Sequence, residues 1–122
     1  HIIGDFDMAI KISAKWKVCC VQQPLATYRW HGGNESISHR ELGIKELERW
    51  SIEMKKCPEI SNNKGFQILL NQITYRKAML LLMNGNTLTA IKYYPKLPFG
   101  MEKLKLLISF LLPIKIIQLL KT

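Results

Sequence analysis

The chain has little cysteine and no pair of cysteines at the spacing of a metal site. Its three cysteines are Cys19, Cys20 and Cys57, an odd number with two adjacent. Small secreted domains carry even sets of paired cysteines, so this pattern favours a reducing compartment. There is no CxxC pair and the histidines are not at finger spacing, which excludes a zinc finger. We expect these thiols in the core or on the surface.

The sequence also lacks an apolar run long enough to cross a bilayer. Residues 106–112 are apolar apart from Ser109, but they lie between Lys105 and Lys115. The nine residues between these lysines are far fewer than the roughly 20 that a spanning helix needs. The pattern of a signal peptide is missing as well. Because the chain starts at His1, within a helical pattern, we expect a fragment of a longer protein.

Acidic residues are nearly missing from the second half of the chain. The net charge is +9, and residues 61–122 hold nine Lys or Arg against one acid, Glu102. This +8 segment indicates an anionic partner or surface. No recognised nucleic-acid-binding motif accompanies the charge, so nucleic acid is not an expected partner.

The basic residues near the C-terminus leave two interpretations open. Four lysines stand beside Leu, Ile and Phe: Lys103, Lys105, Lys115 and Lys121. This combination is typical of an interfacial helix that lies on anionic lipid. Alternatively, the apolar face packs on the preceding helices and the lysines are only solvated.

The chain has 122 residues, of which 48% are hydrophobic, and this is enough to form one domain with a core. An apolar stripe predicts a helix over residues 5–16, with Asp5 and Asp7 in its first turn, where acids complement the helix dipole. A β-type run over 18–21 and alternation over 25–30 predict short strands on either side of Pro24. The paired glycines of residues 31–38 predict a loop.

The rest of the chain predicts helices. They are expected over residues 39–56, 64–85, 86–95 and 100–122. Pro58 and Pro95 should end the first and third of these, and Pro113 should break the last. Asn84-Gly85 is expected to form the C-cap of the second helix.

Several pieces of the first 38 residues form an ordered series. "GDFDMAIKIS" is followed by the β-type run and then by "PLATYRWHGGNESIS". This series resembles the C-terminal half of the catalytic domain of bacterial family 2 glycosyltransferases, which have the GT-A fold. The matching positions are Asp5, Phe6, Asp7, Lys11, Pro24, Leu25, Tyr28, Arg29, His31, Ser36 and Ser38. The resemblance covers about a third of the chain, and the remainder resembles the helical tail of such enzymes in general character only.

The resemblance implies transfer of a sugar, with inversion, from a nucleotide sugar to an acceptor hydroxyl in cell-surface glycan synthesis. Asp5 matches the catalytic base of the family, and Asp7 matches a second position that supports the helix start. His31 matches a histidine that helps to hold the metal, Mn²⁺ or Mg²⁺, or the diphosphate. The substrate-binding positions would be Arg29, Gly32, Gly33, Asn34, Ser36 and Ser38.

The resemblance also implies an α+β fold that is mostly α. Residues 1–38 would be the C-terminal part of the GT-A domain, with two or three short strands. Residues 39–122 would be a basic helical subdomain of three to five helices. An exposed strand edge would allow a homodimer.

The chain departs from the family pattern in two ways. Gly4 replaces the usual acid before the base, and the nucleotide-binding half with its Asp-x-Asp motif is missing. We therefore expect the fragment alone to be inactive. In the full-length enzyme, the acceptor would be a glycan or lipid-linked sugar, and the enzyme would be cytoplasmic and peripheral on the inner face of the membrane. The alternative is a basic helical interaction module that docks on anionic membrane or on an acidic partner.

Overall fold

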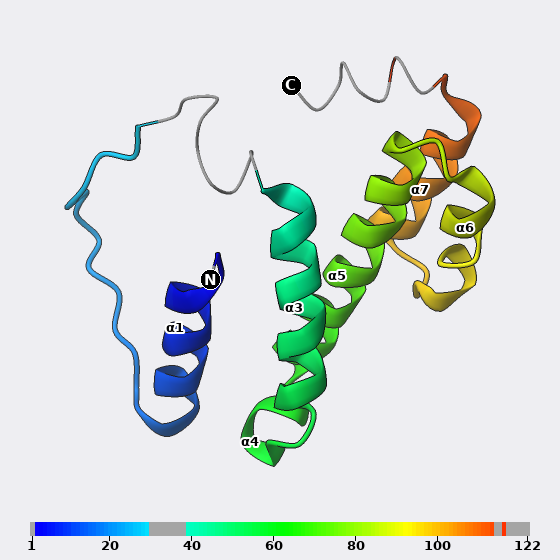
Figure 1. The fold of residues 1–122 in the computed structure, drawn as a ribbon. Coiled ribbons are helices and arrows are strands. Elements are labelled where there is room, and N and C mark those ends of the chain that lie inside the picture. Colours follow the sequence, from blue (N-terminus) through cyan, green and yellow to red (C-terminus); the bar gives the residue numbers. More distant parts are fainter. Residues whose placement is uncertain (1, 30–38, 114–115, 117–122) are drawn as a thin grey trace. The chain divides into compact units, whose positions relative to one another are not determined.

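A computed structural model of the chain describes residues 2–29, 39–113 and 116 (Figure 1). The described elements are, in order, α1 (Gly4–Lys15), α3 (Arg40–Met54), α4 (Pro58–Ser61), α5 (Lys64–Met83), α6 (Thr87–Ile91), the 3-10 helix η1 (Tyr94–Lys96) and α7 (Met101–Leu111). The chain divides into two compact units, His1–Asn62 and Asn63–Thr122, here called unit 1 and unit 2.

The expectation of an α+β fold was wrong for the part of the chain that the structure describes, which is all-α. Neither residues 18–21 nor residues 25–29 form a strand, and residues 17–29 are exposed throughout. A strand is stable only when its backbone groups pair with a neighbouring strand. No other described segment provides such a neighbour. The strand edge on which we based a homodimer is therefore lacking from the described residues.

Unit 1 is built from α1, α3 and α4. Contacts join Ile2 to Glu46 and Phe6 to Trp50. The residue numbers of these partners rise together along both helices, so α1 and α3 run parallel. Trp50 and Met54 are buried on α3. Pro58 does stop α3, but it also starts α4 at the first helical turn, where a missing N–H costs nothing.

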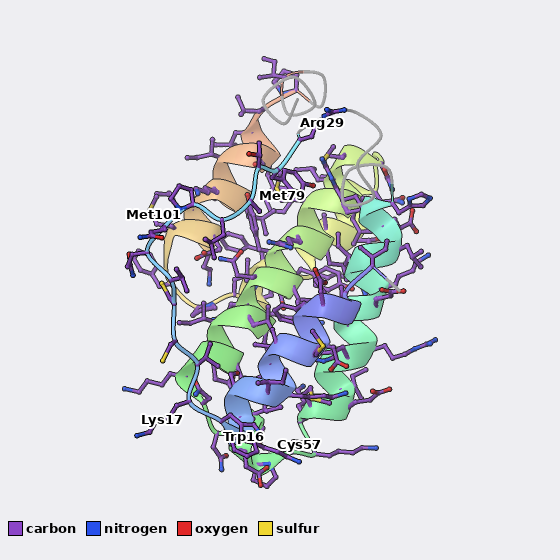
Figure 2. The ribbon with its side chains drawn as sticks, turned by 90° about the vertical axis from the view of Figure 1, so that its left-hand side faces the viewer. Trp16, Lys17, Arg29, Cys57, Met79 and Met101 are labelled. Atoms are coloured by element: carbon purple, nitrogen blue, oxygen red, sulfur yellow. The ribbon has the colours of Figure 1, made fainter. Side chains whose placement is uncertain are left out.

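Unit 2 has a compact core contributed by α5, α6, α7 and the residues between them. Its buried members are Ala78, Met79, Leu82, Ala90, Leu97 and Leu106. Ala78 on α5 and Ala90 on α6 have no exposed surface, because their small side chains let these two helices approach closely. Met79 lies inside this core, whereas Met101 is 62% exposed (Figure 2).

The C-terminus of α5 confirms the predicted Asn84-Gly85 cap. Gly85 has a φ of 79°, a left-handed conformation that glycine adopts without a Cβ penalty. The amide of Asn86 donates to the Leu81 carbonyl at 2.8 Å, and the Gly85 amide donates to Leu82 at 3.0 Å. These two hydrogen bonds form a Schellman motif, which satisfies carbonyls at the helix end.

The later helix ends differ in part from the sequence pattern. Helix α6 ends at Ile91, and Pro95 lies inside η1 rather than after a continuous helix. Helix α7 ends at Leu111, just before Pro113, as predicted. The residue before a proline is disfavoured in the α conformation, and Leu112 is accordingly extended.

Candidate functional site

Asp7 is held in place by two side chains. One oxygen of its carboxylate accepts from Lys11 Nζ at 2.8 Å, and the other accepts from Trp50 Nε1 at 2.6 Å. The Phe6 ring packs edge-to-face on Trp50, with ring centroids 5.2 Å apart. Asp7 therefore ties α1 to α3.

These contacts explain the electrostatics of Asp7. The hydrogen bond from Lys11 is the main cause that lowers the pKa of Asp7, and the bond from Trp50 and the charge of Lys11 add to it. Partial burial acts in the opposite direction. The same hydrogen bond raises the pKa of Lys11. Asp7 is thus ionised at neutral pH and serves as an acceptor, not as a poised base.

Asp5 has a different environment, although it is only two residues away. It lies in the first turn of α1, it is exposed, and its Oδ1 accepts from the Phe6 amide at 2.8 Å. A carboxylate at this position complements the positive end of the helix dipole. Asp5 is available to a molecule in solution.

Glu46 holds the start of α1, and the sequence analysis did not identify it. Its Oε2 accepts from the amides of Ile2 and Ile3, at 2.7 and 3.3 Å. These amides precede α1, whose N-cap residue Ile3 offers no side-chain cap. Only the parallel pairing of α1 with α3 brings Glu46 there, so no local signal could have identified it.

Two grooves in unit 1 adjoin Asp7. The larger has a volume of about 750 Å³, and its lining includes Asp7, Lys11, Trp16, Met54, Cys57 and Ile60. Figure 2 labels Trp16 and Cys57, which lie at the same end of α1 and α3. The smaller, of about 580 Å³, is lined by residues that include Gly4, Asp7, Glu46 and Trp50. Asp5 is not among the lining residues of these two grooves.

The predicted substrate-binding loop lies outside the described residues. His31, Gly32, Gly33, Asn34, Ser36 and Ser38 belong to this part, so their predicted roles stay predictions. Arg29 is the last described residue before it and is exposed (Figure 2). Arg29 lines neither groove.

The described residues do not form a metal site by themselves. Among residues 2–29, 39–113 and 116, no three His, Cys, Asp or Glu side chains come together in a group that could hold a cation. The divalent metal that the resemblance implies does not fit the described residues alone. Its predicted ligand His31 lies outside them.

Two of the four lysines predicted to face a membrane are described. Lys103 donates to the Leu97 carbonyl at 3.0 Å, and its Nζ lies 5.0 Å from the centre of the Tyr94 ring. Lys105 is exposed, while Lys115 and Lys121 lie outside the described residues. None of the described helices combines the length and the apolar character needed to span a bilayer.

Comparison of the chain with protein-family models, with curated proteins and with solved structures finds no match.

Proposed function

We propose that this chain is the C-terminal portion of an inverting family 2 glycosyltransferase, with Asp5 as the catalytic base. The ordered motif series from Asp5 to Ser38 motivates the proposal. The observation that carries it is the difference between the environments of the two acids on α1. Asp7 is held by Lys11 and Trp50, whereas Asp5 is exposed at the helix start.

Asp5 would act on the acceptor hydroxyl. As the hydroxyl oxygen bonds to the anomeric carbon, its proton passes to the Asp5 carboxylate. The bond from that carbon to the diphosphate oxygen breaks, and its electron pair leaves with the nucleoside diphosphate. Attack opposite to the leaving group inverts the anomeric centre.

Asp7 would position this base rather than take part in the reaction. The hydrogen bond between Asp7 and Trp50 fixes the start of α1 against α3. The helical turn that contains Asp5 is therefore held in place. A base must be held within hydrogen-bond reach of the proton that it takes.

Other parts of the proposed enzyme belong to its remaining chain or to residues 30–38. A bound Mn²⁺ or Mg²⁺ would neutralise the charge on the leaving diphosphate. Arg29 and the loop to Ser38 would contact the substrates, and the fragment alone would be inactive. The acceptor would be a glycan or a lipid-linked sugar in the cytoplasm, near the inner face of the membrane.

The test is Asp5→Asn in the full-length enzyme, with Asp7→Asn as the matched control. We expect Asp5→Asn to lower kcat by about 10²–10⁴-fold and to leave binding of the nucleotide sugar intact, because only the proton acceptor is lost. Asp7→Asn keeps an acceptor for Trp50 and should retain most of its kcat. Normal turnover by Asp5→Asn would contradict the assignment.

A further inference from the structure

Helix α7 is apolar on two opposite faces. One face packs inward through Leu106, which has no exposed surface, and Phe110, which contacts Tyr94 edge-to-face. The opposite face, here called the outer face, carries five apolar side chains that are 42–79% exposed: Met101, Leu104, Leu107, Ile108 and Leu111. At about 100° per residue these five fall on one continuous arc of the helix.

The loop before α7 extends the apolar surface of unit 2. Phe99 precedes the helix by two residues and is fully exposed, at 102%. A whole phenyl ring in water is unfavourable relative to burial. Phe99 and the outer face are both apolar, and both are exposed among the described residues.

Lysines border the outer face on both sides. The helical period places Lys105 beside Met101 and Ile108, and it places Lys103 on the other edge, beside Leu107. Lys105 is exposed, and Lys103 is held at its edge by the Leu97 carbonyl and the Tyr94 ring. The arrangement is an apolar strip with a cation along each edge.

We propose that the outer face of α7, with Phe99, docks this chain on an anionic lipid bilayer. The helix would lie in the plane of the interface, with its apolar strip at the acyl boundary and its lysines among the headgroups. This inference goes beyond the proposed sugar transfer and does not depend on it. The C-terminal lysines left two interpretations open: a helix on anionic lipid, or a helix packed on its predecessors. Helix α7 fits both, because one of its faces packs and the other is exposed.

The charge of unit 2 selects lipid over a second copy as the occupant. Residues 61–122 carry a net charge of +8, so two copies meeting at this face would repel each other. The single acid of that segment, Glu102, already accepts from Gln72 at 2.7 Å. An anionic surface gains from every lysine that it meets, by about fivefold in affinity for each.

The test is flotation of the chain with vesicles of phosphatidylcholine alone and of phosphatidylcholine mixed with phosphatidylglycerol. We expect flotation with the mixed vesicles only. Raising the salt from about 0.1 M to 1 M should weaken it, because the Debye length falls from about 10 Å to 3 Å.

Two pairs of variants assign the binding to the outer face. Leu107→Glu should lower binding to mixed vesicles by more than about tenfold, because a carboxylate would enter the acyl boundary. Ile52→Glu, at a site on α3 that is 63% exposed, makes the same chemical change outside unit 2 and should leave binding unchanged. Lys105→Gln should lower binding by about fivefold. Lys55→Gln, after α3, is its control.

Several results would overturn the proposal. Equal flotation with both kinds of vesicle, or with neither, would remove the anionic bilayer as the occupant. A loss with Ile52→Glu as large as that with Leu107→Glu would remove the outer face. A dimer in light scattering that Leu107→Glu turns into a monomer would make a second copy the occupant. If Leu107→Glu loses helicity in circular dichroism, Lys105→Gln still decides the matter.

Discussion

At the scale of single residues, the spacing of Asp5 and Asp7 gives the two acids separate environments. Residues two apart on a helix are turned by about 200° and do not face each other. Because α3 lies along one side of α1, it meets only one of the pair. Asp7 reaches Trp50, and Asp5 stays exposed. Helical geometry thus places Asp5, the candidate base, and Asp7, which binds Trp50, on different sides of α1.

The lowered pKa of Asp7 makes the pairing of α1 with α3 sensitive to acid. A carboxyl whose pKa is lower in the folded state stabilises it at pH values above its unfolded pKa of about 3.9. That contribution is lost as the pH falls through the folded pKa. We therefore expect an acid transition below about pH 4 in the fluorescence of Trp50, which is 5% exposed.

Variants of the two acids isolate this transition. Asp7→Asn should shrink it, because the amide cannot titrate, and Asp5→Asn should leave it unchanged. Glu46 also holds the start of α1 and is present in both variants, so the difference between them reports Asp7 alone. An identical acid transition in the two variants would disprove the role of Asp7.

At the scale of the element, α7 shows that apolar character alone does not reveal which side of a helix is buried. Leu106 and Leu107 are neighbours of the same type, but Leu106 is fully buried and Leu107 is 42% exposed. Their environments differ because successive helical residues point about 100° apart.

Truncation of these two leucines should therefore differ in cost. Leu106→Ala removes a side chain from the core of unit 2, so it should lower the free energy of unfolding by about 2–5 kcal/mol. Leu107→Ala leaves no internal cavity and should cost less than about 1 kcal/mol. Denaturant unfolding of both variants measures the difference. Equal losses would show that the outer face is covered in the folded chain.

At the scale of the whole molecule, each of the two units has its own buried side chains. Unit 1 contains Trp50, Met54 and Ile60, while unit 2 contains the cluster around Met79 and Leu106. Units of about 60 residues bury a modest fraction of their surface and are marginally stable alone.

We expect the two units to respond separately to a destabilising change. Leu106→Ala should accelerate amide hydrogen exchange in α5, α6 and α7, and it should leave exchange in α3 unchanged. Because all three tryptophans precede residue 63, their fluorescence transition in denaturant should also stay where it is. A matching shift of α3 exchange and tryptophan fluorescence would show a single cooperative unit instead.

The helices and several of their ends follow from the sequence, because they depend on interactions between residues close together in the chain. The structure confirms the helix of α1 with its acidic first turn, the glycine cap of α5 and the end of α7 before Pro113. Each of these features depends on neighbouring residues alone. The strands predicted over 18–21 and 25–30 depended on a partner elsewhere in the chain. No local pattern supplies such a partner, and the described residues contain none.

Only the tertiary structure decided what the acids and the apolar faces meet. The sequence placed Asp5 and Asp7 at a helix start, but the packing of α1 beside α3 bound Asp7 to Trp50 and left Asp5 exposed. The sequence likewise showed an apolar helix with lysines beside it. Packing then buried Leu106 and left Leu107 on the surface. Both outcomes depend on which helix lies alongside, and periodicity within one helix does not contain that information.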